Sequence, residues 1–182
     1  MEQKFEHIVY MKFGYHAKKK VQDIIASKKK EFIDNGFMFW GYGGSACNPF
    51  TQVLPFLELS KKLNKKVHLV MAFTTSKPTM EGYASNEFST DGINWQKIPD
   101  KIKVTGSKHA IVCGELIETD FDLNLGDYSV ALGSNEGKNA SAYIKGQSDK
   151  GCFVKNANNV SPNIVKIELV TEILSPYAVK LR

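Results

Sequence analysis

The sequence is poor in residues that form covalent or metal cross-links. Its 182 residues include three cysteines, Cys47, Cys113 and Cys152, and no CxxC spacing. This odd, sparse number argues against a disulfide framework and against a structural zinc site. The four histidines form no HxH, HxxxH or HExxH pattern. We therefore expect no metal and no other cofactor.

Long apolar runs are also absent. No stretch reaches the ~18 uninterrupted apolar residues that a membrane-spanning helix requires, and Glu2, Lys4, Glu6 and Lys12 interrupt the region where a signal peptide would be apolar. We expect a protein with no membrane partner that resides in the cytoplasm, or in the host cytoplasm if it is viral. The composition is typical of an ordinary globular protein, with 42% apolar and 24% charged residues, and the length favours one domain over 1–182.

Arginine is almost missing, since Arg182 is the only one among 24 basic residues. Without guanidinium forks, sequence-specific DNA reading and an arginine finger are disfavoured, although lysines still hold phosphates as point charges. Residues 1–77 carry 13 lysines and 6 acidic residues, a net charge of +7, whereas 78–182 carry a net charge of −2. The N-terminal part is therefore the better place for an anion-facing surface, unless its lysines simply solvate the surface.

Hydrophobic periodicity changes character near residue 75. The first half predicts a β-α-β-α-β order, and the second half predicts mostly strands. The fold class is therefore α+β, a single domain with a mixed β-sheet whose N-terminal β-α-β-α-β segment precedes a mostly antiparallel, β-rich half. The expected strands cover 5–13, 37–40, 66–74, 109–118, 127–132, 151–155, 164–173 and 176–181, the expected helices cover 17–35 and 51–64, Asp91-Gly92 marks a hairpin turn, and 134–150 is a long loop or a short helix.

The first candidate site is the glycine-rich turn between the second strand and the second helix. Such a turn exposes backbone N–H groups that favour an anion, and its glycines permit close approach of a ligand. Aromatic residues beside it could stack on a planar ring, and the polar residues add a hydroxyl and an amide. The alternative is a tight turn that packs its aromatic residues into the core. The predicted ligand-binding residues are Trp40, Tyr42, Gly43, Gly44, Ser45 and Asn48.

The second candidate site is the loop that begins at Gly133. It departs from the P-loop pattern because its glycine interval is one residue short and Asn139 replaces the Mg²⁺-binding Ser or Thr. Hydrolysis of a nucleoside triphosphate by this route is therefore excluded. A looser hypothesis remains, in which Lys138, Lys145 and Lys150 close over phosphates, and the alternative is a solvated loop.

Two weaker patterns leave room for catalysis. Cys47 lies near a predicted helix N-terminus, which lowers a thiol pKa, but nothing in the spacing brings His16, His68 or His109 to it as a base. On a strand, Glu118, Asp120 and Asp122 share one face with Glu115 and Asp127 nearby, and could bind Mg²⁺. A buried apolar cysteine and a solvated acidic face are the simpler interpretations.

These observations favour a non-catalytic binding protein for a nucleotide-like or phosphorylated small molecule. Such a protein could sense a nucleotide signal or sequester it, as some phage proteins do to blunt nucleotide-signalled defence. The alternatives are a cysteine- or metal-dependent hydrolase or transferase, a lysine-rich binder of RNA or single strands, and a protein-interaction module. Assembly into a homo-oligomer stays open.

Overall fold

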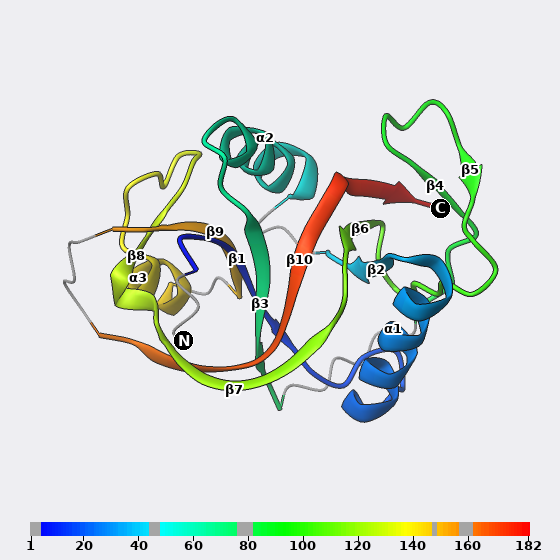
Figure 1. Ribbon diagram of the computed structural model, residues 1–182, viewed down its shortest axis with the longest axis horizontal. Helices are drawn as coiled ribbons and strands as arrows, with labels where there is room; N and C mark the ends of the chain where they lie inside the picture. The colour runs from blue at the N-terminus through cyan, green and yellow to red at the C-terminus, as the bar shows by residue number, and fades with distance from the viewer. Residues whose placement is uncertain (1–4, 44–47, 76–81, 147–148, 157–161) are drawn as a thin grey trace.

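The computed structural model describes residues 5–43, 48–75, 82–146, 149–156 and 162–182, and its elements follow the predicted β-α-β-α-β order in the first half (Figure 1). The first half contains β1 (His7–Phe13), α1 (Val21–Asn35), β2 (Met38–Gly41), a π-helical turn (Pro49–Val53), α2 (Leu54–Lys62) and β3 (Val67–Phe73). The second half contains β4 (Glu87–Ser89), β5 (Gln96–Lys97), β6 (His109–Cys113), β7 (Ile117–Asn124), a 3-10 turn (Leu125–Asp127), β8 (Tyr128–Val130), α3 (Ala140–Lys145), β9 (Lys150–Lys155) and β10 (Ile164–Leu181).

The strands form one mixed sheet in the order β2-β6-β10-β3-β1-β9-β8, with β7 and β4 also paired to β10. Strands β1 and β3 run parallel, whereas β9, β6 and β7 pair with their neighbours antiparallel. The predicted fold class, α+β with a mixed sheet and a largely antiparallel second half, is thereby confirmed. The prediction of two strands over 164–173 and 176–181 differs from the structure, where both belong to β10 and the register with β6 shifts between Ile173 and Ala178.

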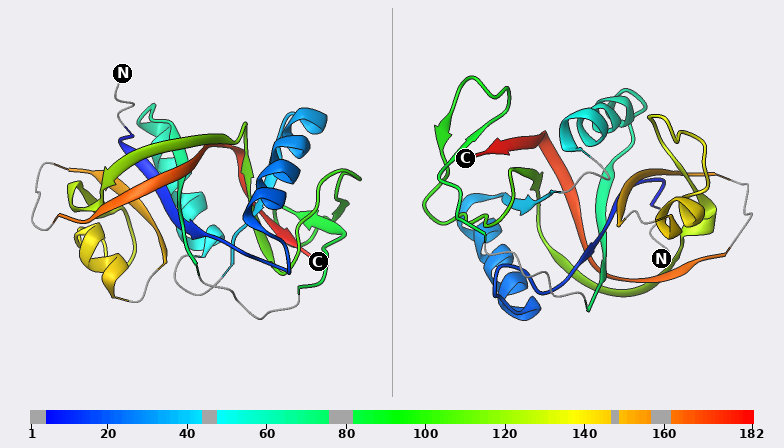
Figure 2. Two further views of the ribbon diagram at one scale, coloured as in Figure 1. Left: turned by 90° about the horizontal axis from the view of Figure 1, so that it is seen from below. Right: turned by 180° about the vertical axis from the view of Figure 1, so that it is seen from behind.

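Both faces of the central strand β1 are buried, which explains its unbroken apolar sequence. Val9 and Met11 belong to a core cluster that also receives Ile25 from α1 and Phe56 from α2. Ile8 and Tyr10 point to the other face, into a second cluster with Ala140 and Ile144 of α3. Helix α3 therefore packs on the other face of β1 from α1. Figure 2 shows that it also lies at the opposite end of the molecule.

Helix α1 ends where the sequence predicts. Gly36 has a φ of 78° and its N–H donates to Phe32 O at 2.7 Å, which is the left-handed cap that favours glycine. The chain then enters β2 directly, so that the end of β2 lies beside α1 and near the end of β1. This placement builds one corner of a cavity.

Candidate functional site

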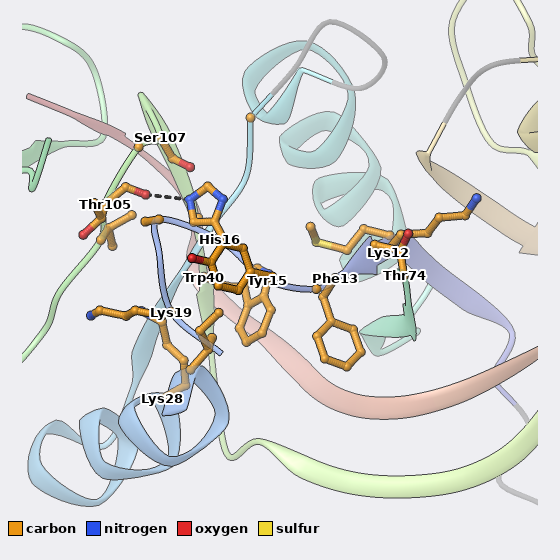
Figure 3. A pocket seen from close by; sticks show the side chains of 18 of the residues that line it. Lys12, Phe13, Tyr15, His16, Lys19, Lys28, Trp40, Thr74, Thr105 and Ser107 are labelled. Atoms are coloured by element: carbon orange, nitrogen blue, oxygen red, sulfur yellow. Dashed lines mark hydrogen bonds between the residues drawn. The ribbon is translucent and has the colours of Figure 1, made fainter. Parts of the chain in front are cut away.

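A cavity of about 830 Å³ opens where β1, β2 and β3 end (Figure 3). Phe13 and Gly14 line it at the end of β1, Trp40 at the end of β2, and Thr74 just after β3. The carboxyl ends of strands in β-α-β units are the usual place for ligands, and the volume lies in the range of small-molecule sites. The remaining walls come from α1, the 103–107 segment and the start of β9.

The ends of β1 and β3 approach each other closely at this cavity. Thr74 N donates to Phe13 O at 2.7 Å. A Cβ on Gly14 would lie 2.5 Å from Thr74 O, a distance that real Cβ atoms do not show. Glycine is therefore required at position 14, and the wall of the cavity is fixed by this contact.

Three aromatic residues, Phe13, Tyr15 and Trp40, lie together in the cavity (Figure 3). The rings of Phe13 and Trp40 pack edge to face, with centroids 6.4 Å apart. Trp40 is only 6% exposed, so most of its ring is covered by protein. Tyr15 is half-buried and offers the more accessible ring for stacking.

His16 is held by a tight turn at the edge of the cavity. Lys19 N donates to His16 O at 2.9 Å, and the two residues between them, Ala17 and Lys18, have φ values of 47° and 62°. Such left-handed conformations cost non-glycine residues about 1–3 kcal/mol each and cluster at functional sites. His16 Nε2 donates to Thr105 O at 2.9 Å, because a carbonyl oxygen can only accept. Nε2 therefore carries a proton.

Lys28 brings a buried positive charge to the cavity from α1. Its ammonium donates to Glu31 Oε1 and Oε2 at 2.9 and 3.0 Å, to Phe39 O at 2.6 Å and to Lys103 O at 2.8 Å. Glu31 also accepts from Lys103 N at 3.0 Å. Burial lowers the pKa of Lys28 and raises the pKa of Glu31, and each charge opposes the shift of the other. The pair joins α1 to β2 and to the 103–107 segment, and its charges compensate each other.

Lys150 brings a second buried charge from the start of β9, with only 7% of the residue exposed. Its ammonium donates to Gly43 O and lies 5.0 Å from the centre of the Tyr42 ring. In the part of the chain that the structure describes, Asp149 is the one carboxylate within ion-pair distance, at 4.0 Å, and its side chain is 60% exposed. The charge of Lys150 is therefore weakly compensated.

The structure brings together three of the residues predicted from the glycine-rich turns. Trp40, Gly43 and Lys150 all line the cavity. Tyr42 is fully buried behind them, so it offers no ring face to a ligand. Asn48 is exposed and its Oδ1 accepts from Phe50 N at 2.9 Å, which caps the π-helical turn. Gly44, Ser45 and Cys47 lie outside the described residues.

The structure does not bring Lys138 and Lys145 to this cavity. Both are exposed and lie near or in α3, at the end of the molecule away from α1 (Figure 1). Gly133 and Gly137 have φ values of 87° and 81° there, so they serve the turns of that loop. Among its described residues, the loop predicted to close over phosphates thus contributes Asp149 and Lys150 to the cavity.

The acidic strand is β7, and its acidic side chains face solvent and lysines. Glu118 pairs with Lys29 at 2.5 Å, and Asp120 pairs with Lys166 at 2.6 Å. Across the described ranges, no group of three or more His, Cys, Asp or Glu side chains is placed to hold a metal ion. The geometry of β7 therefore fits a solvated, ion-paired face.

The predicted histidine bases lie in separate places. The ring of His68 packs on Phe5, and that of His109 packs on Phe50, while His16 lines the cavity. Burial lowers the pKa of both His68 and His109.

Sequence reasoning missed the cavity residues Phe13, Tyr15 and Lys28 as well as the 103–107 segment, and it considered His16 only as a base for Cys47. A signal was present, because Gly14-Tyr15-His16 follows the first strand of a β-α-β unit, where ligand sites concentrate. The 103–107 segment is distant in sequence, and no pattern in it indicates its place.

Comparisons of the chain with protein-family models, with curated proteins and with solved structures returned no match. None of the helices built from the described residues combines the length and the apolar character needed to cross a bilayer. The cavity and its side chains are therefore the basis for any functional conclusion.

Proposed function

We propose that this chain binds a nucleotide-like or phosphorylated small molecule, without turnover, in the cavity at the ends of β1, β2 and β3. The observation that carries the proposal is Lys150, a buried residue of the cavity lining whose ammonium has one carbonyl acceptor and one distant carboxylate among the described residues. A buried charge is costly unless it is paired and hydrogen-bonded. The anionic group of a ligand would supply that pairing.

The rest of the cavity supports a ligand that also carries a ring. Tyr15 is accessible for stacking, and His16 presents a ring nitrogen beside it. Lys12, Lys19 and Lys103 are exposed lysines of the lining, and they add positive charge that attracts anions toward the opening. A cavity of about 830 Å³ has room for a nucleotide.

Binding without turnover is favoured by the chemistry of the lining. Among the described lining residues, the titratable groups other than lysines are Tyr15, His16 and Asp149. His16 is anchored through Nε2 to Thr105 O, and Asp149 points largely to solvent. A pair of groups with opposed acid and base roles, as general acid–base catalysis requires, is not formed by these three. Sensing or sequestering a nucleotide signal is the role we propose for such a binder.

The proposal is tested by native mass spectrometry of the purified protein and a thermal-shift screen with nucleotides, cyclic dinucleotides and ADP-ribose derivatives. At a free ligand concentration of 100 Kd, binding stabilises the folded state by ~2.7 kcal/mol, which the screen resolves. Lys150→Met should abolish the stabilisation. Lys138→Met is the matched control, because Lys138 is exposed and lies outside the cavity.

Two results would contradict the proposal. One is an unchanged Tm across the whole panel. The other is a ligand that stabilises the wild type and Lys150→Met equally. Recovery of a chemically altered compound would instead show turnover and replace binding with catalysis.

A further inference from the structure

The cavity contains two buried lysines whose charges are compensated to very different extents. Lys28 and Lys150 are 8% and 7% exposed, so burial alone does not distinguish them. Lys28 has four acceptor atoms within 3.0 Å, and two of these belong to the carboxylate of Glu31. All three of its N–H donors are therefore used, and its charge is neutralised within the protein.

The ammonium of Lys150 has a poorer set of partners in the described chain. It donates to the neutral carbonyl of Gly43 and faces the ring of Tyr42 at 5.0 Å. The carboxylate of Asp149 is 4.0 Å away and mostly in solvent, where its charge is screened. Positive charge is thus available to a ligand at Lys150 and not at Lys28.

The two lysines also belong to different walls. Lys28 and Lys12 lie on opposite sides of Phe13, Tyr15 and Trp40 (Figure 3). Lys150 is paired with Met11, the neighbour of Lys12, across β1 and β9. The Lys28 ammonium donates to Phe39 O, whereas the Lys150 ammonium donates to Gly43 O, four residues further along the chain. The other lysines of the lining, Lys12, Lys19 and Lys103, are exposed, so solvent screens their charge. The buried charge available to a ligand and the neutral Lys28–Glu31 pair therefore lie at different points along the segment that contains β2.

We infer that the cavity takes its ligand in one orientation, with a single anionic group at Lys150 and an uncharged planar ring toward the Lys28–Glu31 pair. The ligand class is then a ring compound with one anionic group, such as a nucleoside monophosphate, rather than a compound with anionic groups at both ends. This inference rests on the proposed function, because it assigns the two ends of that same site.

The test uses inorganic phosphate as the probe for the anion subsite and measures its apparent Kd by titration at constant ionic strength. Lys150→Met should raise the apparent Kd for phosphate at least about tenfold, as expected for loss of a charge-assisted hydrogen bond. The double variant Lys28→Met/Glu31→Leu removes the neutral pair together, a replacement that buried ion pairs often tolerate. It should leave the apparent Kd within about threefold of the wild-type value, since the pair adds no net charge.

A gain-of-function variant strengthens the test. Glu31→Gln removes the carboxylate that opposes the effect of burial on the Lys28 pKa, so that a second anionic group of a ligand would take over this role. Adenosine 3′,5′-bisphosphate should then gain affinity relative to adenosine 5′-monophosphate, whereas the wild type should not prefer the bisphosphate. If Glu31→Gln does not fold, the comparison of Lys150→Met with the double variant still shows at which lysine the anionic group binds.

The experiments distinguish a wrong ligand orientation from a wrong proposed function. A phosphate response that survives Lys150→Met and disappears in the double variant would overturn the assigned orientation and leave anion binding intact. A wild-type preference for the bisphosphate would also overturn it. If wild type responds neither to phosphate nor to any nucleotide, the proposed function fails, and the orientation fails with it.

Discussion

Lys28 and Lys150 are the same residue type, equally buried, and line the same cavity, yet their surroundings differ. The Lys28 ammonium is enclosed by a carboxylate and two carbonyls that join α1, β2 and the 103–107 segment. The Lys150 ammonium has one carbonyl and a distant, exposed carboxylate among the described residues. The number of compensating partners, rather than burial, thus distinguishes Lys28, which joins the walls of the cavity, from Lys150, where we propose that an anion binds.

The largest change in the free energy of unfolding is expected when the Lys28–Glu31 ion pair is broken. Lys28→Met leaves the carboxylate of Glu31, which is 1% exposed, without its charged partner, although it keeps its hydrogen bond from Lys103 N. Removing one member of a buried ion pair typically costs about 3–5 kcal/mol. The free energy of unfolding, measured by urea denaturation, should fall by that amount. The double variant Lys28→Met/Glu31→Leu should recover most of it, and equal losses in both variants would contradict the pairing.

The same substitution at the other lysine should affect binding more than folding. Lys150→Met removes one hydrogen bond to Gly43 O and an incompletely compensated buried charge, two effects of opposite sign. In phosphate-free buffer its free energy of unfolding should therefore change by no more than about 1 kcal/mol. A loss as large as that of Lys28→Met would place Lys150 among the structural residues and remove the contrast between the two.

A third prediction concerns the pH dependence of stability, which arises from buried histidines rather than from the two lysines. Burial lowers the pKa of His7, His68 and His109 below the ordinary histidine value of 6.5. Between the folded and unfolded pKa values the unfolded chain binds more protons, so stability is lost as the pH falls below about 6.5. Urea midpoints should decrease from about pH 7 to about pH 5.

His7 offers a matched variant for the acid effect. Its Nδ1 donates to Ser60 Oγ at 2.7 Å, since that hydroxyl donates to Phe56 O. His7→Asn places an amide donor near the same position without a titratable group, so the decrease at low pH should be smaller. An unchanged pH slope would show that His7 does not contribute.

The smallest change in the free energy of unfolding is expected for substitutions on β7, where the ion pairs are exposed to solvent rather than buried. Asp120→Asn removes an exposed ion pair with Lys166 and should change the free energy of unfolding by less than about 1 kcal/mol. Mg²⁺ or a chelator should leave the Tm unchanged. A rise in Tm with Mg²⁺ that is lost in Asp120→Asn would show that β7 binds a metal ion. It would contradict the interpretation as a solvated face and favour the metal-dependent hydrolase or transferase.

The fold could be predicted well from local patterns because β1, β2 and β3 each carry an apolar run and α1 carries a helical periodicity. Gly36 also marks the end of α1. The continuity of β10 could not be predicted, because Ser175-Pro176 indicates a break in the sequence, whereas the strand continues through an irregular register with β6.

The candidate site could be predicted only in part. The end of β2 indicated Trp40 and Gly43, and the start of β9 supplied Lys150. The opposite wall depends on a pairing of Lys28 with the backbone of Lys103, which lies 75 residues away. A lysine triplet on a helix looks the same whether one member turns inward or all face solvent, so sequence alone did not single out Lys28.

The most direct measurement is the structure of the complex with the compound that stabilises the wild type most in the thermal-shift screen. We predict that one anionic group lies within hydrogen-bond distance of Lys150 Nζ, that the ring lies beside Tyr15, and that the Lys28–Glu31 pair is unchanged. A ligand bound at the exposed lysines near α3, or an anionic group seated on Lys28 with Lys150 left unpaired, would contradict this prediction.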